Sequence, residues 1–296
     1  MEINDLSKKI KLTDNNKIIG TAELINSKIV FSGKNNILYL EEDVVLENSS
    51  LEFNVDGSLI YLSKNRHPYK VNIAVYNNNT VFIDKHCYFN DVMNITLSEQ
   101  ANVFIGEEGV FSFGIWLRTA DPHLIFSSVT RNRLNPSKSI FIGDHVWLGQ
   151  NALLLKGTRI DSGSIVGAMS VVSGKKIPSN QIWAGNPVRF IKREIFWDAT
   201  SVNRFPPERT KLSLTYKTFI NDIKKLKRFV YSYNEKQKIE FNDIDKELVR
   251  LNTKERLDYL IELSKNSKKN RFVHFKTKRN IFVRGIRKIK RELKKK

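Results

Sequence analysis

Aliphatic residues recur at every sixth position through the middle of the chain. They are Ile142, Leu148, Leu154, Ile160, Val166 and Val172. A helix repeats near 3.6 residues and a strand near 2, so neither explains a period of six. Three short strands joined by three turns close a triangular coil of about 18 residues, and stacked coils bury one aliphatic side chain per face. The period therefore predicts a parallel β-solenoid.

The same pattern continues towards the N-terminus in a looser form. Its aliphatic anchors are Leu40, Leu62, Ile83, Ile105 and Ile142, with gaps of 22, 21, 22 and 37 residues. The first three gaps fit one coil with a few extra residues at a corner, whereas the fourth requires a long insertion. We expect a β-helix domain that spans 1–197. Because Leu117 still keeps the phase of the repeat, the insertion into this domain is expected at 118–139. Loops of this length on a rigid solenoid are uncommon without a function.

The pattern changes after Trp197. Two adjacent prolines, Pro206 and Pro207, indicate a linker over 198–213, and 214–296 is expected to form a helical, basic extension. Apolar residues at helical spacing predict one helix near 216–230 and others within "IDKELVRL" and "TKERLDYLIEL", with Asn252 and Glu255 spaced as a helix cap. A last amphipathic helix is expected near the C-terminus, with lysines and arginines around an apolar stripe.

Charge concentrates in this extension. The chain has a net charge of +19, and residues 198–296 hold 29 Lys and Arg against 12 Asp and Glu. Contact of the last helix with an anionic membrane, binding of an anionic polysaccharide and a merely solvated tail all remain open. Nucleic acid is not expected as a partner, because few aromatic residues lie among the charges.

The remaining bulk features are typical of a cytoplasmic protein. Cys87 is the only cysteine, so the chain can form no internal disulfide bond. We see no apolar core of a secretory signal in "MEINDLSKKI". The location expected is cytoplasmic, with peripheral contact at the inner face of the plasma membrane as an alternative.

At this point the motifs can be compared with a known family. The stretches "LRTADPH", "NPSKSIFIGDHVWLGQNALLLKGTRI" and "AGNPVRFIK", within about 115–193, resemble the hexapeptide-repeat O-acetyltransferases, above all those acting on capsules and other surface polysaccharides. The resemblance implies a left-handed parallel β-helix, a homotrimer with sites between subunits, and acetyl-CoA as co-substrate without a metal. Residues 20–114 match in pattern only, and 198–296 do not match.

Transfer of an acetyl group from a thioester to a hydroxyl needs a base for the hydroxyl proton, and histidine suits that role near neutral pH. His123 in "TADPH" matches the catalytic histidine of the resembling enzymes. By the same resemblance, Trp147 lines the pocket for CoA and acceptor, and Asn90 lies on the acceptor side; packing and a corner turn are their structural alternatives. Asp121 either binds the acceptor or shapes the loop.

Two sets of residues correspond to the CoA site of the resembling family. The wall for the pantetheine arm is expected at Gly149, Gln150, Gly167 and Ala168, and the nucleotide end at Ser173, Lys175, Arg189 and Lys192. Gly174 adds one residue to the usual motif, which leaves open whether Lys175 or Lys176 makes the contact.

The function expected is therefore O-acetylation of a sugar hydroxyl of a capsular or other surface polysaccharide, with acetyl-CoA as donor and His123 as general base. N-acetylation of an amino sugar nucleotide and a non-enzymatic solenoid with a basic docking tail are the alternatives. A zinc-dependent prism would need paired histidines at short spacing, and the sequence has none.

Overall fold

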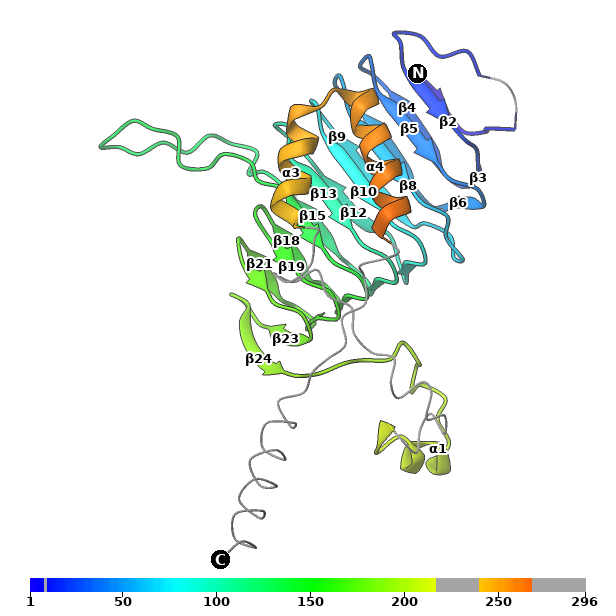
Figure 1. Cartoon of the computed structure of the whole chain (residues 1–296), viewed down its shortest axis with the longest axis vertical. Helices are drawn as coiled ribbons and strands as arrows, with labels where there is room; N and C mark the ends of the chain where they lie inside the picture. Colours follow the sequence, from blue (N-terminus) through cyan, green and yellow to red (C-terminus); the bar gives the residue numbers. More distant parts are fainter. Residues whose placement is uncertain (8–9, 217–239, 268–296) are drawn as a thin grey trace, which may run out of the picture. The chain divides into compact units, whose positions relative to one another are not determined.

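The computed structural model describes residues 1–7, 10–216 and 240–267. The chain divides into two compact units, the first made of Met1–Ala199 and Tyr231–Arg271, the second of Thr200–Val230 and Phe272–Lys296. The first unit is a solenoid with three long faces, partly covered by two helices (Figure 1).

Sheet I forms the first face of the solenoid. Its neighbouring strands are parallel, except that β1 is antiparallel to β4. In spatial order they are β1 (Glu2–Ile3), β4 (Lys28–Phe31), β7 (Ser50–Phe53), β9 (Val71–Val75), β12 (Met93–Thr96), β15 (Trp116–Arg118), β18 (Leu153–Leu155) and β21 (Val171–Ser173).

Sheet II forms the second face, and all of its strands are parallel. In spatial order they are β2 (Lys17–Ile19), β5 (Ile37–Leu40), β8 (Leu59–Leu62), β10 (Thr80–Ile83), β13 (Asn102–Ile105), β16 (Ile140–Ile142), β19 (Arg159–Ile160) and β22 (Lys176–Ile177).

Sheet III forms the third face in the C-terminal coils, and a short parallel pair takes its place in the first coils. The pair is β3 (Ala22–Ile25) and β6 (Val44–Glu47). Sheet III runs through β11 (Tyr88–Phe89), β14 (Val110–Phe111), β17 (Trp147–Leu148), β20 (Ile165–Val166), β23 (Gln181–Ala184) and β24 (Arg189–Arg193). From β10 onwards the chain passes from sheet II to sheet III to sheet I in turn, whereas β8 of sheet II is followed directly by β9 of sheet I. Only the terminal pair β23–β24 of sheet III is antiparallel.

The period of six appears in the structure as ladders of buried side chains. All six aliphatic residues of the repeat are fully buried. Leu154 pairs in register with Leu117 above and Val172 below, and Ile142 pairs with Ile105 and Ile160. Burial of such a side chain contributes about 1.5–3 kcal/mol, so the ladders hold the coils together. The expected mainly β, parallel solenoid is confirmed.

Two C-terminal helices cover sheet II (Figure 1). They are α3 (Phe241–Arg250) and α4 (Thr253–Ser267), and both belong to the same compact unit as the solenoid. Their buried apolar residues pack on outward-facing aromatic residues of the sheet, among them Tyr61, Phe82 and Phe104. The sequence shows why α3 lies this way, since Phe241, Ile244 and Leu248 fall on one helical face.

Helix α4 begins with the expected cap. The backbone N–H of Asn252 donates to Glu255 Oε2 at 2.9 Å, and the N–H of Glu255 donates to Asn252 Oδ1 at 3.1 Å. In its first turn Arg256 donates to the carbonyl oxygens of Gly57 and Asn78 at 3.3 and 2.9 Å, which ties the helix to the solenoid corners.

The division of the chain into 1–197, 198–213 and 214–296 stays a prediction. Within the expected linker the second unit contains a short helix, α1 (Pro207–Leu212). Most of the helix expected near 216–230 and all of the last basic helix lie outside the described residues. Within 1–7, 10–216 and 240–267, no helix is long and apolar enough to cross a membrane.

Candidate active site

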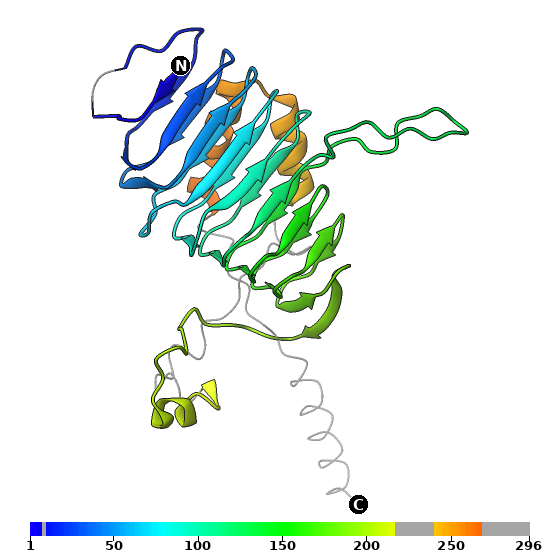
Figure 2. The same ribbon diagram turned by 180° about the vertical axis from the view of Figure 1, so that it is seen from behind.

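A long excursion leaves the solenoid at the corner between sheets I and II. It runs from the end of β15 to the start of β16 and projects from the coils (Figures 1 and 2). Its two limbs are antiparallel, with a bridge between Phe126 and Arg133 and a hydrogen bond from Leu134 N–H to Ile125 O at 2.8 Å. We call residues 119–139 the arm. The insertion expected at 118–139 begins one residue later, because Arg118 still belongs to β15.

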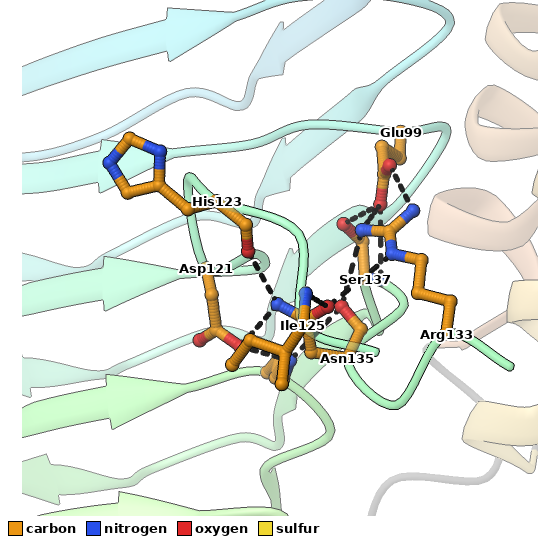
Figure 3. A network of polar contacts seen from close by, with 8 residues as sticks. Glu99, Asp121, His123, Ile125, Arg133, Asn135 and Ser137 are labelled. Atoms are coloured by element: carbon orange, nitrogen blue, oxygen red, sulfur yellow. Dashed lines mark hydrogen bonds and ion pairs between the residues drawn. The ribbon is translucent and has the colours of Figure 1, made fainter. Parts of the chain in front are cut away.

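His123 lies at the base of the arm. Its side chain is exposed, and the imidazole points away from the polar contacts beside it (Figure 3). Its backbone is held, because Asn135 Nδ2 from the returning limb donates to the His123 carbonyl oxygen at 2.7 Å. The base of the arm therefore combines an accessible imidazole with a restrained main chain.

Asp121 lies two residues before His123 and faces the solenoid. Its Oδ2 atom accepts from Lys156 Nζ at 2.5 Å and from Asn135 Nδ2 at 3.2 Å. The hydrogen bond from Lys156, supported by that from Asn135, lowers the pKa of the Asp121 carboxyl group. The carboxylate is thus ionised and bound to the chain itself, which agrees with the interpretation that it shapes the loop.

The returning limb is fixed on its other side by Glu99, from the corner between β12 and β13. Arg133 donates to both Glu99 oxygens, at 2.6 and 3.0 Å, and Ser137 Oγ donates to Oε2 at 2.6 Å (Figure 3). The bonds from Arg133 and then Ser137 lower the pKa of Glu99 to about 2. Paired N–H donors to one carboxylate give a defined geometry.

Other expected site residues gather at the opposite border of sheet I, at the corner with sheet III. Asn90, Gly149, Gln150 and Ala168 all lie between a strand of sheet III and the next strand of sheet I. A Cβ atom on Gly149 would lie 2.5 Å from the nitrogen of Ala168, so close stacking of the coils itself requires this glycine. Gly167 lies at the same corner.

Trp147 lies beside this corner on β17, with its side chain facing outward and 41% exposed. Its ring centroid is 6.0 Å from that of Trp197. The indole is therefore partly packed within the chain and partly open to solvent. Asn90 accepts a hydrogen bond from the Tyr88 hydroxyl at 3.2 Å, so its amide oxygen has a local partner.

The four residues expected at the nucleotide end of CoA lie at two separate places in the fold. Ser173 is the exposed last residue of β21, and Lys175 is exposed at the corner between β21 and β22, one coil beyond Lys156. Arg189 and Lys192 are exposed on β24. Within one chain, the residues around His123 and the residues around Gly149 thus lie at the two borders of sheet I.

Comparison with known proteins gives a consistent result in sequence and in fold. No protein-family model matches the chain. A polysialic acid O-acetyltransferase of Escherichia coli O1:K1 / APEC is 34% identical over 104 residues, 35% of this chain and 34% of that protein. One from Neisseria meningitidis is 26% identical over 145 residues, 48% of this chain and 67% of that protein.

Among solved structures, the polySia-specific acetyltransferase NeuO matches with a TM-score of 0.56 and 27% identity, over 71% of this chain and 98% of that one. In sequence and in fold, the chain is related to the hexapeptide-repeat acetyltransferases. These structural neighbours are left-handed β-helix proteins, in agreement with the hand that the resemblance implied. The chain spans about a third of the length of the E. coli relative, so the activity of that whole protein is carried over only as a proposal.

The polysialic acid O-acetyltransferases and a galactoside O-acetyltransferase of Lactococcus lactis all match this chain in sequence. These matches favour an acyltransferase over a non-enzymatic solenoid. In this hexapeptide-repeat chain, sequence reasoning missed Asn135, Lys156 and the pair of Arg133 and Glu99. Lys156 and Asp121 are 35 positions apart, and only the stacking of coils brings them together. The position of Asn135 directly before a proline, near the end of the insertion, was the one available signal.

A second histidine needs to be distinguished from His123. His145 is buried and stacked on Trp197, with ring centroids 3.9 Å apart, and its Nε2 atom is 3.1 Å from the Trp197 carbonyl oxygen. Burial lowers the pKa of His145. An imidazole covered in this way cannot reach an acceptor hydroxyl. Among the described residues, no group of His, Cys, Asp and Glu side chains is arranged to hold a metal ion.

Proposed function

We propose that this protein transfers an acetyl group from acetyl-CoA to a sugar hydroxyl of a capsular or other surface polysaccharide. The relatives support this class of acceptor, because two of them are named for O-acetylation of polysialic acid. The single structural observation that carries the proposal is the exposed His123 imidazole at the braced base of the arm.

The chemistry assigned to His123 is general base catalysis. The imidazole takes the proton of the acceptor hydroxyl as the oxygen attacks the carbonyl carbon of the thioester. A C–O bond forms, the C–S bond breaks, and the proton passes from the imidazolium to the departing thiolate of CoA. Exposure of the ring leaves it free to meet both substrates.

The residues expected to hold acetyl-CoA have suitable chemistry. Lys175, Arg189 and Lys192 are exposed cations, and Ser173 is an exposed hydroxyl, all able to donate to phosphate oxygens. At the other corner, Gln150 and Ala168 are exposed beside closely stacked backbone. An exposed corner with small side chains suits the approach of a pantetheine arm that hydrogen-bonds to peptide groups.

Assembly as a homotrimer is part of the same proposal. Helices α3 and α4 cover sheet II, so sheets I and III remain for association. Since the His123 edge and the Gly149 edge border sheet I on opposite sides, one complete site would combine His123 of one copy with Trp147 and Gly149 of another. This arrangement supports sites between subunits.

The location and the basic extension belong to the same proposal. The proposed location is cytoplasmic, in keeping with acetyl-CoA as the donor. The excess of lysine and arginine beyond residue 198 supports contact with an anionic acceptor polymer or with the inner face of the plasma membrane.

The test is release of thiol from acetyl-CoA in the presence of polysialic acid and a panel of other capsular polysaccharides. We expect His123→Ala to lower kcat by about 10²- to 10⁴-fold while CoA binding by calorimetry is retained. Ser128→Ala, an exposed position on the same arm, is the matched control and should act as wild type.

Full turnover by His123→Ala would refute the assigned base. Failure of the wild type to bind CoA would favour a non-enzymatic solenoid. The same assay with an amino sugar nucleotide, followed by NMR of the product, separates O-acetylation from N-acetylation.

A further inference from the structure

One buried amide closes the base of the arm. Asn135 is 5% exposed, and its side chain contacts the outgoing limb three times. Nδ2 donates to His123 O at 2.7 Å and to Asp121 Oδ2 at 3.2 Å, and Oδ1 accepts from Ile125 N–H at 2.9 Å (Figure 3). An amide offers two donors and an acceptor oxygen, so Asn135 satisfies both of its ends within the arm.

These contacts fall on alternate residues centred on His123. Residues 121, 123 and 125 are all held by the same side chain, at the carboxylate of Asp121 and at the main chain of His123 and Ile125. A contact that served only to close the arm could lie anywhere along the two limbs. This one holds the main chain of His123 itself, from which the imidazole projects.

We call the Asn135 side chain with its three contacts to residues 121, 123 and 125 the clamp. It is in turn tied to two different coils of the solenoid. Lys156, between β18 and β19, donates to Asp121 and, at 3.3 Å, to the Asn135 carbonyl oxygen. Glu99, between β12 and β13, holds Arg133, whose guanidinium group donates to the same Asn135 carbonyl oxygen at 3.2 Å. The backbone of Asn135 is therefore fixed by the coils on both sides of the arm.

We infer that Asn135 is a positioning residue that sets the place of the His123 imidazole relative to the solenoid. The inference rests on the proposed function, in which His123 is the base. Asn135 acts through the Asp121 side chain and through the main chain of His123 and Ile125. Displacement of a catalytic group by about 1 Å can cost about 10²-fold in rate, so a side chain of this kind has a measurable effect on catalysis.

The experiment compares Asn135→Ala with Asn132→Ala, an exposed asparagine of the same arm. We expect Asn135→Ala to lower kcat by about tenfold to a hundredfold, with KM for acetyl-CoA within about twofold of wild type. Asn132→Ala should keep both constants. Asn135→Asp is the second variant, since it keeps the shape and the acceptor oxygen but loses both donors, and we expect the same loss of kcat.

A double-mutant cycle separates positioning from general damage. In the His123→Ala background, Asn135→Ala should cause no further loss, because no imidazole remains to be positioned. An equal loss in both backgrounds, or wild-type kcat in both Asn135 variants, overturns the inference and leaves the proposed function standing.

Hydrogen exchange tests the clamp independently of activity. The amides of Ile125 and Leu134 are hydrogen-bonded across the base of the arm, and both should exchange at least about tenfold faster in Asn135→Ala than in Asn132→Ala. Unchanged exchange overturns the clamp itself. If His123→Ala is fully active while exchange changes as expected, the proposed base is wrong and the clamp positions a different group.

Discussion

The cover of helices on sheet II can be tested through one aromatic side chain, by the substitution Phe241→Ala. Phe241 begins α3 and is fully buried. Its ring centroid lies 5.1 Å from that of Phe141 and 6.1 Å from that of Phe104. The guanidinium carbon of Arg159 lies 4.8 Å from the same ring centroid. Because Phe104, Phe141 and Arg159 lie on β13, β16 and β19, this residue joins the helix to three coils of the solenoid.

The expected loss follows from these contacts. Truncation of a buried Phe to Ala costs about 3–5 kcal/mol. Aromatic pairs contribute about 0.5–1.5 kcal/mol beyond burial, and a cation over a ring about 0.5–2 kcal/mol. Since α3 has only three buried side chains, Phe241, Ile244 and Leu248, the substitution removes its largest anchor. We expect α3 to open locally while the solenoid stays folded.

Hydrogen exchange measured by mass spectrometry distinguishes local from global opening. Peptides covering 241–250 should lose protection in Phe241→Ala, and peptides covering 142–172 should keep it. Val249→Ala is the control, because Val249 is on the same helix and 52% exposed. Wild-type protection across α3 in Phe241→Ala would refute the reasoning, as would equal loss of protection in both variants.

Two further predictions concern the corners of the solenoid. Arg133 holds the pKa of Glu99 at about 2, below its ordinary value of 4.5, so the stabilisation of the arm base is complete above about pH 4.5 and is lost as the pH falls towards 2. Thermal unfolding of Glu99→Gln should lack this contribution at neutral pH, and a pH dependence identical to wild type between pH 2 and 5 would contradict the argument. Gly149→Ala should lower unfolding free energy by about 1–3 kcal/mol, because its Cβ meets Ala168 backbone at 2.5 Å. Gly174→Ala adds a Cβ no closer than 3.9 Å to its nearest neighbour and should cost about 1–2 kcal/mol, from its positive φ alone; wild-type stability of Gly149→Ala in denaturant unfolding would count against steric conflict at Gly149.

The faces of the coil could be predicted because they carry a regular signal. Ile142 and Leu154 lie where the period of six places them, buried and paired with the equivalent residues of the next coils. The break in the same period located the arm to within one residue. The motif within the arm singled out His123, and the structure adds that its side chain is exposed.

The corners carry no such period, so their contacts could not be derived from the sequence. Asp121 meets Lys156 across 35 positions, and Ser139 meets Asp245 across 106, at 2.6 Å. Which corner residues meet depends on how many residues each coil adds at each turn and on where the arm leaves and returns. The hydrogen bonds around His123 and the packing of α3 on sheet II therefore result from the stacking of the coils.

The sequence by itself determined that the chain coils with three faces, because one buried aliphatic side chain per face is a local and repeated requirement. It also determined that an arm with a histidine interrupts the coils. Only the tertiary structure decided that Asn135 holds the His123 main chain, that α3 and α4 cover sheet II, and that the expected site residues lie at two borders of sheet I. The physical reason is that hydrophobic burial repeats along the chain, whereas each polar contact at a corner needs two distant residues brought within about 3 Å by the completed fold.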